Sequence, residues 1–173
     1  MNNIFTTELK KLYNVFTEMG NAVSDQIKQA TESYVNHDKA AAQALVQQDQ
    51  SINSNEVDLE KQALTLMTLQ QPVADDFRNV ITILKASSDL ERIGDHATGI
   101  ALETIRVKGL QRNDDVEAKI ASLTKTIRGM LTEALTALQA INMEQAQTVA
   151  EQDQEVEAQF DEIRRTITAA NQD

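Results

Sequence analysis

The stretch ITILKASSDLERIGDHATGIA, residues 81–101, predicts one long and regular helix. Its apolar residues recur at alternating spacings of three and four, which is the period of one helix face. They are Ile83, Ala86, Leu90, Ile93, Ala97 and Ile100. Because such a face is stable only against other apolar surfaces, we expect this helix to lie inside a bundle of antiparallel helices.

The composition of the chain agrees with an all-α fold. Five glycines and one proline in 173 residues leave long segments without a helix breaker. The net charge of −11 disfavours binding to nucleic acid or to anionic lipid, and the absence of cysteine excludes disulfides and thiolate metal sites. No apolar run approaches the roughly 20 residues that span a bilayer, and the N-terminal residues lack the layout of a secretory signal. We therefore expect a cytoplasmic protein without membrane insertion.

Periodicity along the rest of the chain predicts five helices and no strand. Their expected ranges are 3–35, 39–70, 72–108, 114–140 and 143–171. Short interruptions separate these ranges, so neighbouring helices should run antiparallel.

Residues with helix-capping chemistry stand at the interruptions. Asp38 is a candidate N-cap of the second helix, and Pro72 is placed to be the first residue of the third. Asp114 with Glu117 and Asn142 with Gln145 have the spacing of capping boxes for the last two helices.

An internal repeat is visible at an offset of 104 residues. The segment AQALVQQDQSI (42–52) aligns with AQTVAEQDQEV (146–156), and Met19 and Val23 align with the apolar Leu123 and Ile127. This repeat predicts a first three-helix bundle over residues 1–109 and a partial second bundle of two helices over residues 110–173.

The two-helix unit should expose apolar residues that a third helix would cover. On its first helix they are Val116, Ile120, Leu123 and Ile127, and on its second they are Val156, Phe160, Ile163 and Ile167. We therefore expect a homodimer or an exchanged helix that covers this face.

Two carboxylates lie one turn apart on the 81–101 helix. Since Leu90 and Ile93 are expected on its apolar face, Glu91 and Asp95 should face solvent, with about 6 Å between them. A solvated helix face is one explanation. A site for a cation such as magnesium, manganese, calcium or iron is the other, and Gly94 would then keep that surface open.

Further acidic residues could complete such a cation site. Asp49 interrupts the apolar stripe of the preceding helix, its repeat mate Asp153 does the same, and Glu56 follows two turns later. Neither His37 nor His96 stands in a Glu-x-x-His pair, and no glycine-rich phosphate loop is present. These patterns leave two classes open, a carboxylate-metal protein (a metal buffer or metalloenzyme) and a helical interaction module without a ligand.

The stretch QQPVADDFRNVITILKASSDLERIGDHATGIA, residues 70–101, closely resembles the signature helix of the PhoU family, and QQDQSIN (47–53) is similar to that family's second-helix motif. The resemblance covers nearly the whole chain. It implies a tandem of two antiparallel three-helix bundles, of which the second here lacks its last helix. A truncated or naturally short member of the family is therefore expected.

The resemblance also implies a metal site and a role. Paired acidic residues at i and i+4 would hold iron, manganese, magnesium or zinc. In this chain the matching positions are Glu91 and Asp95, Asp49 with Asn53 in place of the usual acid, and Asp153 with Glu157. The implied role is not enzymatic. It is that of an adaptor between the ATPase of a phosphate ABC transporter and a sensor histidine kinase, which represses phosphate-starvation signalling.

Overall fold

The computed structural model describes residues 3–48, 50–107 and 113–170, and these residues form seven helices and no strand. The helices are α1 (Asn3–Val35), α2 (Lys39–Gln48), α3 (Gln50–Gln70), α4 (Ala74–Arg106), α5 (Asp114–Gln139), α6 (Met143–Glu151) and α7 (Asp153–Ala170). The prediction of an all-α bundle is confirmed.

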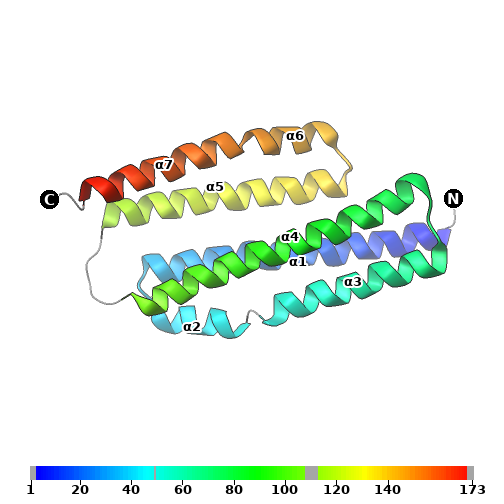
Figure 1. Cartoon of the computed structure of the whole chain (residues 1–173), viewed down its shortest axis with the longest axis horizontal. Helices are drawn as coiled ribbons and strands as arrows, with labels where there is room; N and C mark the ends of the chain where they lie inside the picture. The colour runs from blue at the N-terminus through cyan, green and yellow to red at the C-terminus, as the bar shows by residue number, and fades with distance from the viewer. Residues whose placement is uncertain (1–2, 49, 108–112, 171–173) are drawn as a thin grey trace.

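The helices form an elongated bundle in which α1 has the most neighbours. Helix α1 packs against α2, α3, α4 and α5, while α6 and α7 pack only against α5 and each other. Figure 1 shows α5 running antiparallel to α1, with α6 and α7 returning along α5. The first unit consists of α1, α2, α3 and α4, which pack against one another. The second unit is the helical hairpin of α5, α6 and α7, and it contacts the first unit through the packing of α5 on α1.

Two of the five expected helices are divided, so the prediction of five continuous helices is wrong in this detail. The expected helix 39–70 is split between α2 and α3, and the expected helix 143–171 is split at Gln152. Gln152 keeps right-handed helical dihedral angles, with φ −67° and ψ −14°, and its amide donates to Val149 O at 3.1 Å in the tighter i to i−3 pattern. Neither glycine nor proline is needed for such a turn, so the sequence carried no signal for it.

The start of α4 also differs from the prediction. The helix begins at Ala74, and Pro72 lies in the connection that precedes it. Val73, the residue before the helix, is extended, with φ −126° and ψ 160°, and gives no side-chain cap. Gln71 has a φ of 46°, which turns the chain sharply before the proline.

Side-chain caps at two helix starts are confirmed, and one is displaced. Asp38 Oδ1 accepts a hydrogen bond from the Ala41 amide at 2.9 Å, and Asn142 Oδ1 accepts one from the Gln145 amide at 3.0 Å. The cap of α5 is Asn113 rather than Asp114, because Asn113 Oδ1 accepts from the Val116 amide at 3.1 Å.

The buried face of α4 is rotated from the expected one. Ile100, expected on the buried face, is 39% exposed, and Ile93 is half-buried. The centre of the buried face is formed by Leu90, Ala97 and Ala101 together with Gly94. Three of these four residues are alanine or glycine, and such small residues allow a neighbouring helix to approach closely. The prediction from apolar spacing instead placed the larger isoleucines on the buried face.

The repeat at an offset of 104 is borne out by the backbone. His37 and its repeat mate Ile141 both adopt the left-handed region, with φ of 54° and 52°. The amide that follows each of them donates to an equivalent carbonyl: Asp38 N to Ser33 O at 2.8 Å, and Asn142 N to Ala137 O at 2.8 Å. The two turns therefore have the same construction. The boundary predicted between the units at residues 109 and 110 lies outside the described residues.

The contact between α1 and α5 is reciprocal. Thr31 Oγ1 lies 2.9 Å from Thr124 Oγ1, and a Cβ added at Gly20 would lie 2.5 Å from Leu135 Cδ1. Thr124 is the repeat mate of Gly20, and Leu135 is the repeat mate of Thr31. Each position thus meets the mate of the other, which is the pattern of a two-fold related interface.

Arg128 lies next to the axis of this relation. Arg128 is the repeat mate of Ser24. Its Nε donates to the carbonyl oxygen of Ser24 at 2.9 Å and to Ser24 Oγ at 3.1 Å. Leu135 belongs to the same buried cluster as the core of the first unit. The two units are therefore joined by apolar packing as well as by hydrogen bonds.

Two glycine substitutions should have opposite effects on stability. Gly20→Ala places a methyl group against buried Leu135 and should cost about 1–3 kcal/mol of overpacking, partly offset by about 1 kcal/mol of helix propensity. Gly129→Ala, on α5, meets nothing within 4 Å and should stabilise the chain by about 1 kcal/mol. Urea unfolding of both variants checks this. A stabilising Gly20→Ala would contradict the close approach of α1 and α5.

Candidate metal-binding surface

The acidic pair on α4 lies at the edge of its buried face. Glu91 is half-buried and Asp95 is exposed, one helical turn apart. Gly94, expected to keep this surface open, is itself buried, so that part of the interpretation is wrong. The two carboxylates thus lie beside the contact between α4 and its neighbours.

Basic and imidazole groups stand near this pair on the same helix. Arg92 Nη1 lies 3.6 Å from Asp89 Oδ1, and both side chains are exposed. His96 is exposed, as expected of a solvated helix histidine. The surface around the pair therefore carries both signs of charge.

The partner residues on the preceding helix are only partly described. Glu56, on α3, is half-buried. Asp49 lies outside the described residues, and Asn53 belongs to α3 while its side chain lies outside the description. Among the side chains that are described, no three of His, Asp and Glu come within reach of one metal ion. Helix α4 thus carries two carboxylates, Glu91 and Asp95, whose chemistry suits a hard cation, and the metal site stays a prediction.

The matching pair in the second unit is exposed. Asp153 and Glu157 lie one turn apart on α7 and are the repeat mates of Asp49 and Asn53. Asp153 is the first residue of α7, where a negative charge stabilises the helix dipole with or without a metal. No counterpart of the α4 pair faces it among residues 113–170.

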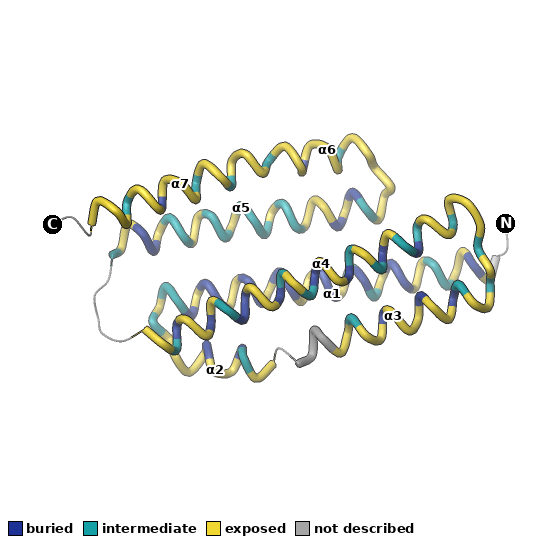
Figure 2. Tube along the Cα trace, in the orientation of Figure 1, coloured by how far each residue is buried: buried dark blue, intermediate teal, exposed yellow. Residues whose placement is uncertain are grey.

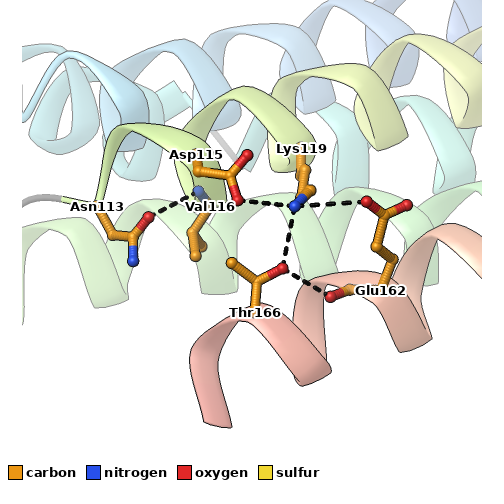
Figure 3. A network of polar contacts seen from close by, with 6 residues as sticks. All are labelled: Asn113, Asp115, Val116, Lys119, Glu162 and Thr166. Atoms are coloured by element: carbon orange, nitrogen blue, oxygen red, sulfur yellow. Dashed lines mark hydrogen bonds and ion pairs between the residues drawn. The ribbon is translucent and has the colours of Figure 1, made fainter. Parts of the chain in front are cut away.

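A polar network that the sequence analysis missed joins α5 to α7 (Figure 3). Lys119 Nζ lies 2.7 Å from Asp115 Oδ2 and 3.4 Å from Glu162 Oε1, and it donates to Thr166 Oγ1 at 3.0 Å. The bond to Asp115 raises the pKa of Lys119, partial burial opposes this, and Glu162 adds to the rise. The spacing of Asp115 and Lys119 was a readable signal, but the partners on α7 required the fold.

A second polar contact crosses between the units. His37 Nε2 lies 2.8 Å from Oε1 of Glu117, whose side chain is 10% exposed. Lys39, at the start of α2, donates from Nζ to the carbonyl oxygens of Ile105 and Val107 at 3.1 and 2.6 Å. These hydrogen bonds connect the start of α2 to the end of α4. Glu117, expected in a capping box, instead links α5 to the turn after α1.

A groove of about 420 Å³ opens between the start of α1 and the end of α3. It is lined by Ile4, Glu8, Lys11 and Leu12 of α1 and by Lys61, Gln62, Thr65, Leu66, Leu69 and Gln70 of α3. Ile4 and Leu69 are 60% and 71% exposed, and Lys11 Nζ lies 2.7 Å from Glu8 Oε1. Because these two large apolar side chains are exposed at the groove, it suits the binding of an apolar side chain of a partner.

Within the described part of the chain, no helix combines the length and the apolar character that a membrane crossing requires.

Comparison with known proteins agrees with this arrangement. The family model of the PhoU domain matches residues 16–104 and again residues 120–173. A PhoU homolog from Clostridium acetobutylicum, described as a phosphate-specific transport system accessory protein, is 30% identical over 92% of this chain and 73% of its own length. The homolog of the same description from Streptococcus pneumoniae serotype 4 is 30% identical over 100% of this chain and 80% of its own length.

Solved structures give the same result. The crystal structure of the phosphate transport system regulatory protein PhoU from Streptococcus pneumoniae has a TM-score of 0.88 and 27% identity, and covers 95% of this chain and 77% of that chain. PhoU from Pseudomonas aeruginosa has a TM-score of 0.87 and 27% identity, with coverages of 96% and 79%. The two family matches begin at residues 16 and 120, which are 104 residues apart and therefore equivalent positions of the repeat. The chain belongs to the PhoU family.

Proposed function

We propose that this chain is a cytoplasmic regulator of phosphate uptake that represses phosphate-starvation signalling. Family membership carries the proposal: the family model matches both units, and relatives at 30% identity bear the name of a phosphate-specific transport system accessory protein. These names are those of accessory and regulatory proteins rather than of enzymes.

The regulator would act as an adaptor between the ATPase of a phosphate ABC transporter and a sensor histidine kinase. A long helical bundle with a net charge of −11 offers several exposed faces for basic patches on such partners. The groove between α1 and α3, with exposed Ile4 and Leu69, is a suitable place for an apolar anchor side chain.

A metal ion and a second copy of the chain belong to the same proposal. Glu91 and Asp95 would supply carboxylate ligands for iron, manganese, magnesium or zinc, with Asp49, Asn53 and Glu56 from the segment that precedes α4 in the sequence. Asp153 and Glu157 would supply a second set on α7. The chain would act as a homodimer.

Deletion of the gene from its own organism tests the regulatory role. In phosphate-replete medium, the deletion strain should express phosphate-starvation genes at the level that wild-type cells reach only when starved, because repression is lost. A transcriptional reporter for those genes gives the measurement. Reintroduction of the gene should restore repression, and unchanged reporter activity in the deletion strain would contradict the proposed role.

Melting temperatures with and without metal test the proposed ligands. Manganese, iron or magnesium should raise the melting temperature of the wild-type chain, because an ion that binds only the folded state stabilises it. The double variant Glu91→Gln with Asp95→Asn should lose this rise, since amides bind hard cations more weakly than carboxylates do.

A matched control separates ligation from a general loss of charge. Asp75→Asn with Glu103→Gln makes the same two changes at exposed positions near the ends of α4, where each acid pairs with an arginine. The control should keep the metal response of the wild-type chain. Equal responses in all three proteins would leave Glu91 and Asp95 as a solvated helix face and would contradict their role as metal ligands.

A further inference from the structure

The groove between α1 and α3 has an apolar floor and an apolar outer end. Leu12 and Leu66 line it and are buried, so they form the floor between the two helices. Figure 1 shows α1 and α3 running in opposite directions, and the start of α1 therefore lies beside the end of α3. This order places Ile4 with Leu69 at the outer end, where both side chains are exposed.

The exposed apolar surface continues from Leu69 into the connection that leads to α4. Among the residues that the structure describes, Leu69 and Val73 are the most exposed large apolar residues after Met143. In Figure 2 exposed residues predominate from the end of α3 to the start of α4.

The local backbone of this connection is not optimised for stability. Gln71 and Ala74 have φ of 46° and 49°, a region that costs free energy for residues other than glycine. Val73 occupies the N-cap of α4 without a side-chain hydrogen bond, where serine or asparagine would stabilise the helix. Strain and a missing cap beside exposed apolar residues are typical of a surface that serves binding rather than folding.

The inner end of the groove is basic. Lys11 and Lys61 line it from opposite walls, and their side chains are 64% and 71% exposed. The lining also contains Glu8, so two lysines and one glutamate give it a net charge of +1, in a chain whose net charge is −11. Lys11 pairs with Glu8 at 2.7 Å and Lys61 with Asp58 at 3.5 Å, and exposed pairs of this kind are weak enough to exchange for a partner's carboxylate.

We propose that this groove binds an amphipathic helix of a partner protein, with an apolar anchor at one end and an acidic residue at the other. The anchor would lie between Ile4 and Leu69. The carboxylate would meet Lys11 and Lys61. The inference rests on the adaptor role of the proposed function and specifies the kind of segment that the adaptor receives.

The dimensions of the groove set the spacing of the bound residues. Ile4 and Lys11 are seven residues apart on α1, which is about 10.5 Å along the helix. A helix that lies along the groove presents residues i and i+7 on one face at the same separation. The partner segment should therefore carry an apolar residue and an aspartate or glutamate seven positions apart, with a further apolar residue between them over Leu12 and Leu66.

A helix suits this groove better than an extended segment. Both walls are helices, and the described residues include no strand whose edge could pair with an extended backbone. An extended segment would leave its amide and carbonyl groups without partners over the apolar floor, whereas a helix satisfies its own. Its apolar face can then pack between the two walls, as helices do in a bundle.

The phosphate-starvation reporter tests the apolar end. In the deletion strain supplied with Leu69→Glu, reporter activity in phosphate-replete medium should rise to the level of the deletion strain, because a charge replaces the apolar wall. Leu64→Glu is the matched control: Leu64 lies on the same helix, is 47% exposed and is not part of the lining, so its variant should repress as the wild-type chain does. Circular dichroism of the purified full chains should show equal helicity and equal melting temperatures.

Charge reversal tests the basic end. Lys11→Glu with Lys61→Glu should also release repression, because like charges would then meet. Lys28→Glu with Lys85→Glu makes the same change of net charge at exposed positions outside the groove and should keep repression. If Leu69→Glu and the Lys11, Lys61 double variant both repress normally, the groove is not the docking site, although the regulatory role still stands.

Photocrosslinking tests the occupant without the reporter. A benzophenone amino acid at position 69 of the full chain, in cells of its own organism, should attach to a segment of another protein with the apolar and acidic residues seven positions apart. The same amino acid at position 64 should give no such product. A product with lipid or with a second copy of this chain alone, or equal products from both positions, would overturn the inference. An unchanged reporter in the deletion strain would overturn the regulatory role instead, and the crosslink would still decide the occupant.

Discussion

The reciprocal contact between α1 and α5 determines how the rest of the molecule is arranged. Helix α1 must bury one face against α2, α3 and α4 and present another to α5. Gly20 makes this possible, because a side chain there would collide with Leu135. The hydrogen bonds between Thr31 and Thr124 and between Arg128 and Ser24 fix the register of the two helices. The hairpin of α5, α6 and α7 is thereby attached to a completed bundle.

The two units are packed to different extents and offer different surfaces. Glu117 and Lys119 hold α5 to the first unit and to α7 through polar contacts, yet the apolar face between α5 and α7 is only partly covered. The first unit carries the acidic motif of α4 and the groove beside Leu69, so the two units offer different surfaces.

The sequence was sufficient for the fold because its signals were redundant. Three-and-four spacing, polar caps and the repeat at 104 residues all indicate antiparallel helices, and the turns at His37 and Ile141 bear out the repeat in detail. The errors arose where one signal acted alone. The larger Ile100 suggested the buried face, whereas small residues such as Gly94 form its centre. Asp114 competed with Asn113 for the cap, and the side chain one residue earlier makes the bond.

The candidate site was less predictable from sequence for a physical reason. The spacing of Glu91 and Asp95 sets the distance along one helix, but burial and partners depend on how α4 is rotated against its neighbours. Contacts between residues far apart in the chain, such as His37 with Glu117 or Lys119 with Thr166, leave no periodic signal at all. The proposed ligands Asp49 and Asn53 come from a segment of the chain other than α4, so spacing along one helix does not place them.

The second unit repeats the first, but its helices bury their apolar residues less completely. Native-state hydrogen exchange, measured residue by residue, tests this difference most directly. The account predicts a smaller opening free energy for amides of α7 near Ile163 than for amides of α1 near Val23. Equal opening free energies in both helices would contradict the account.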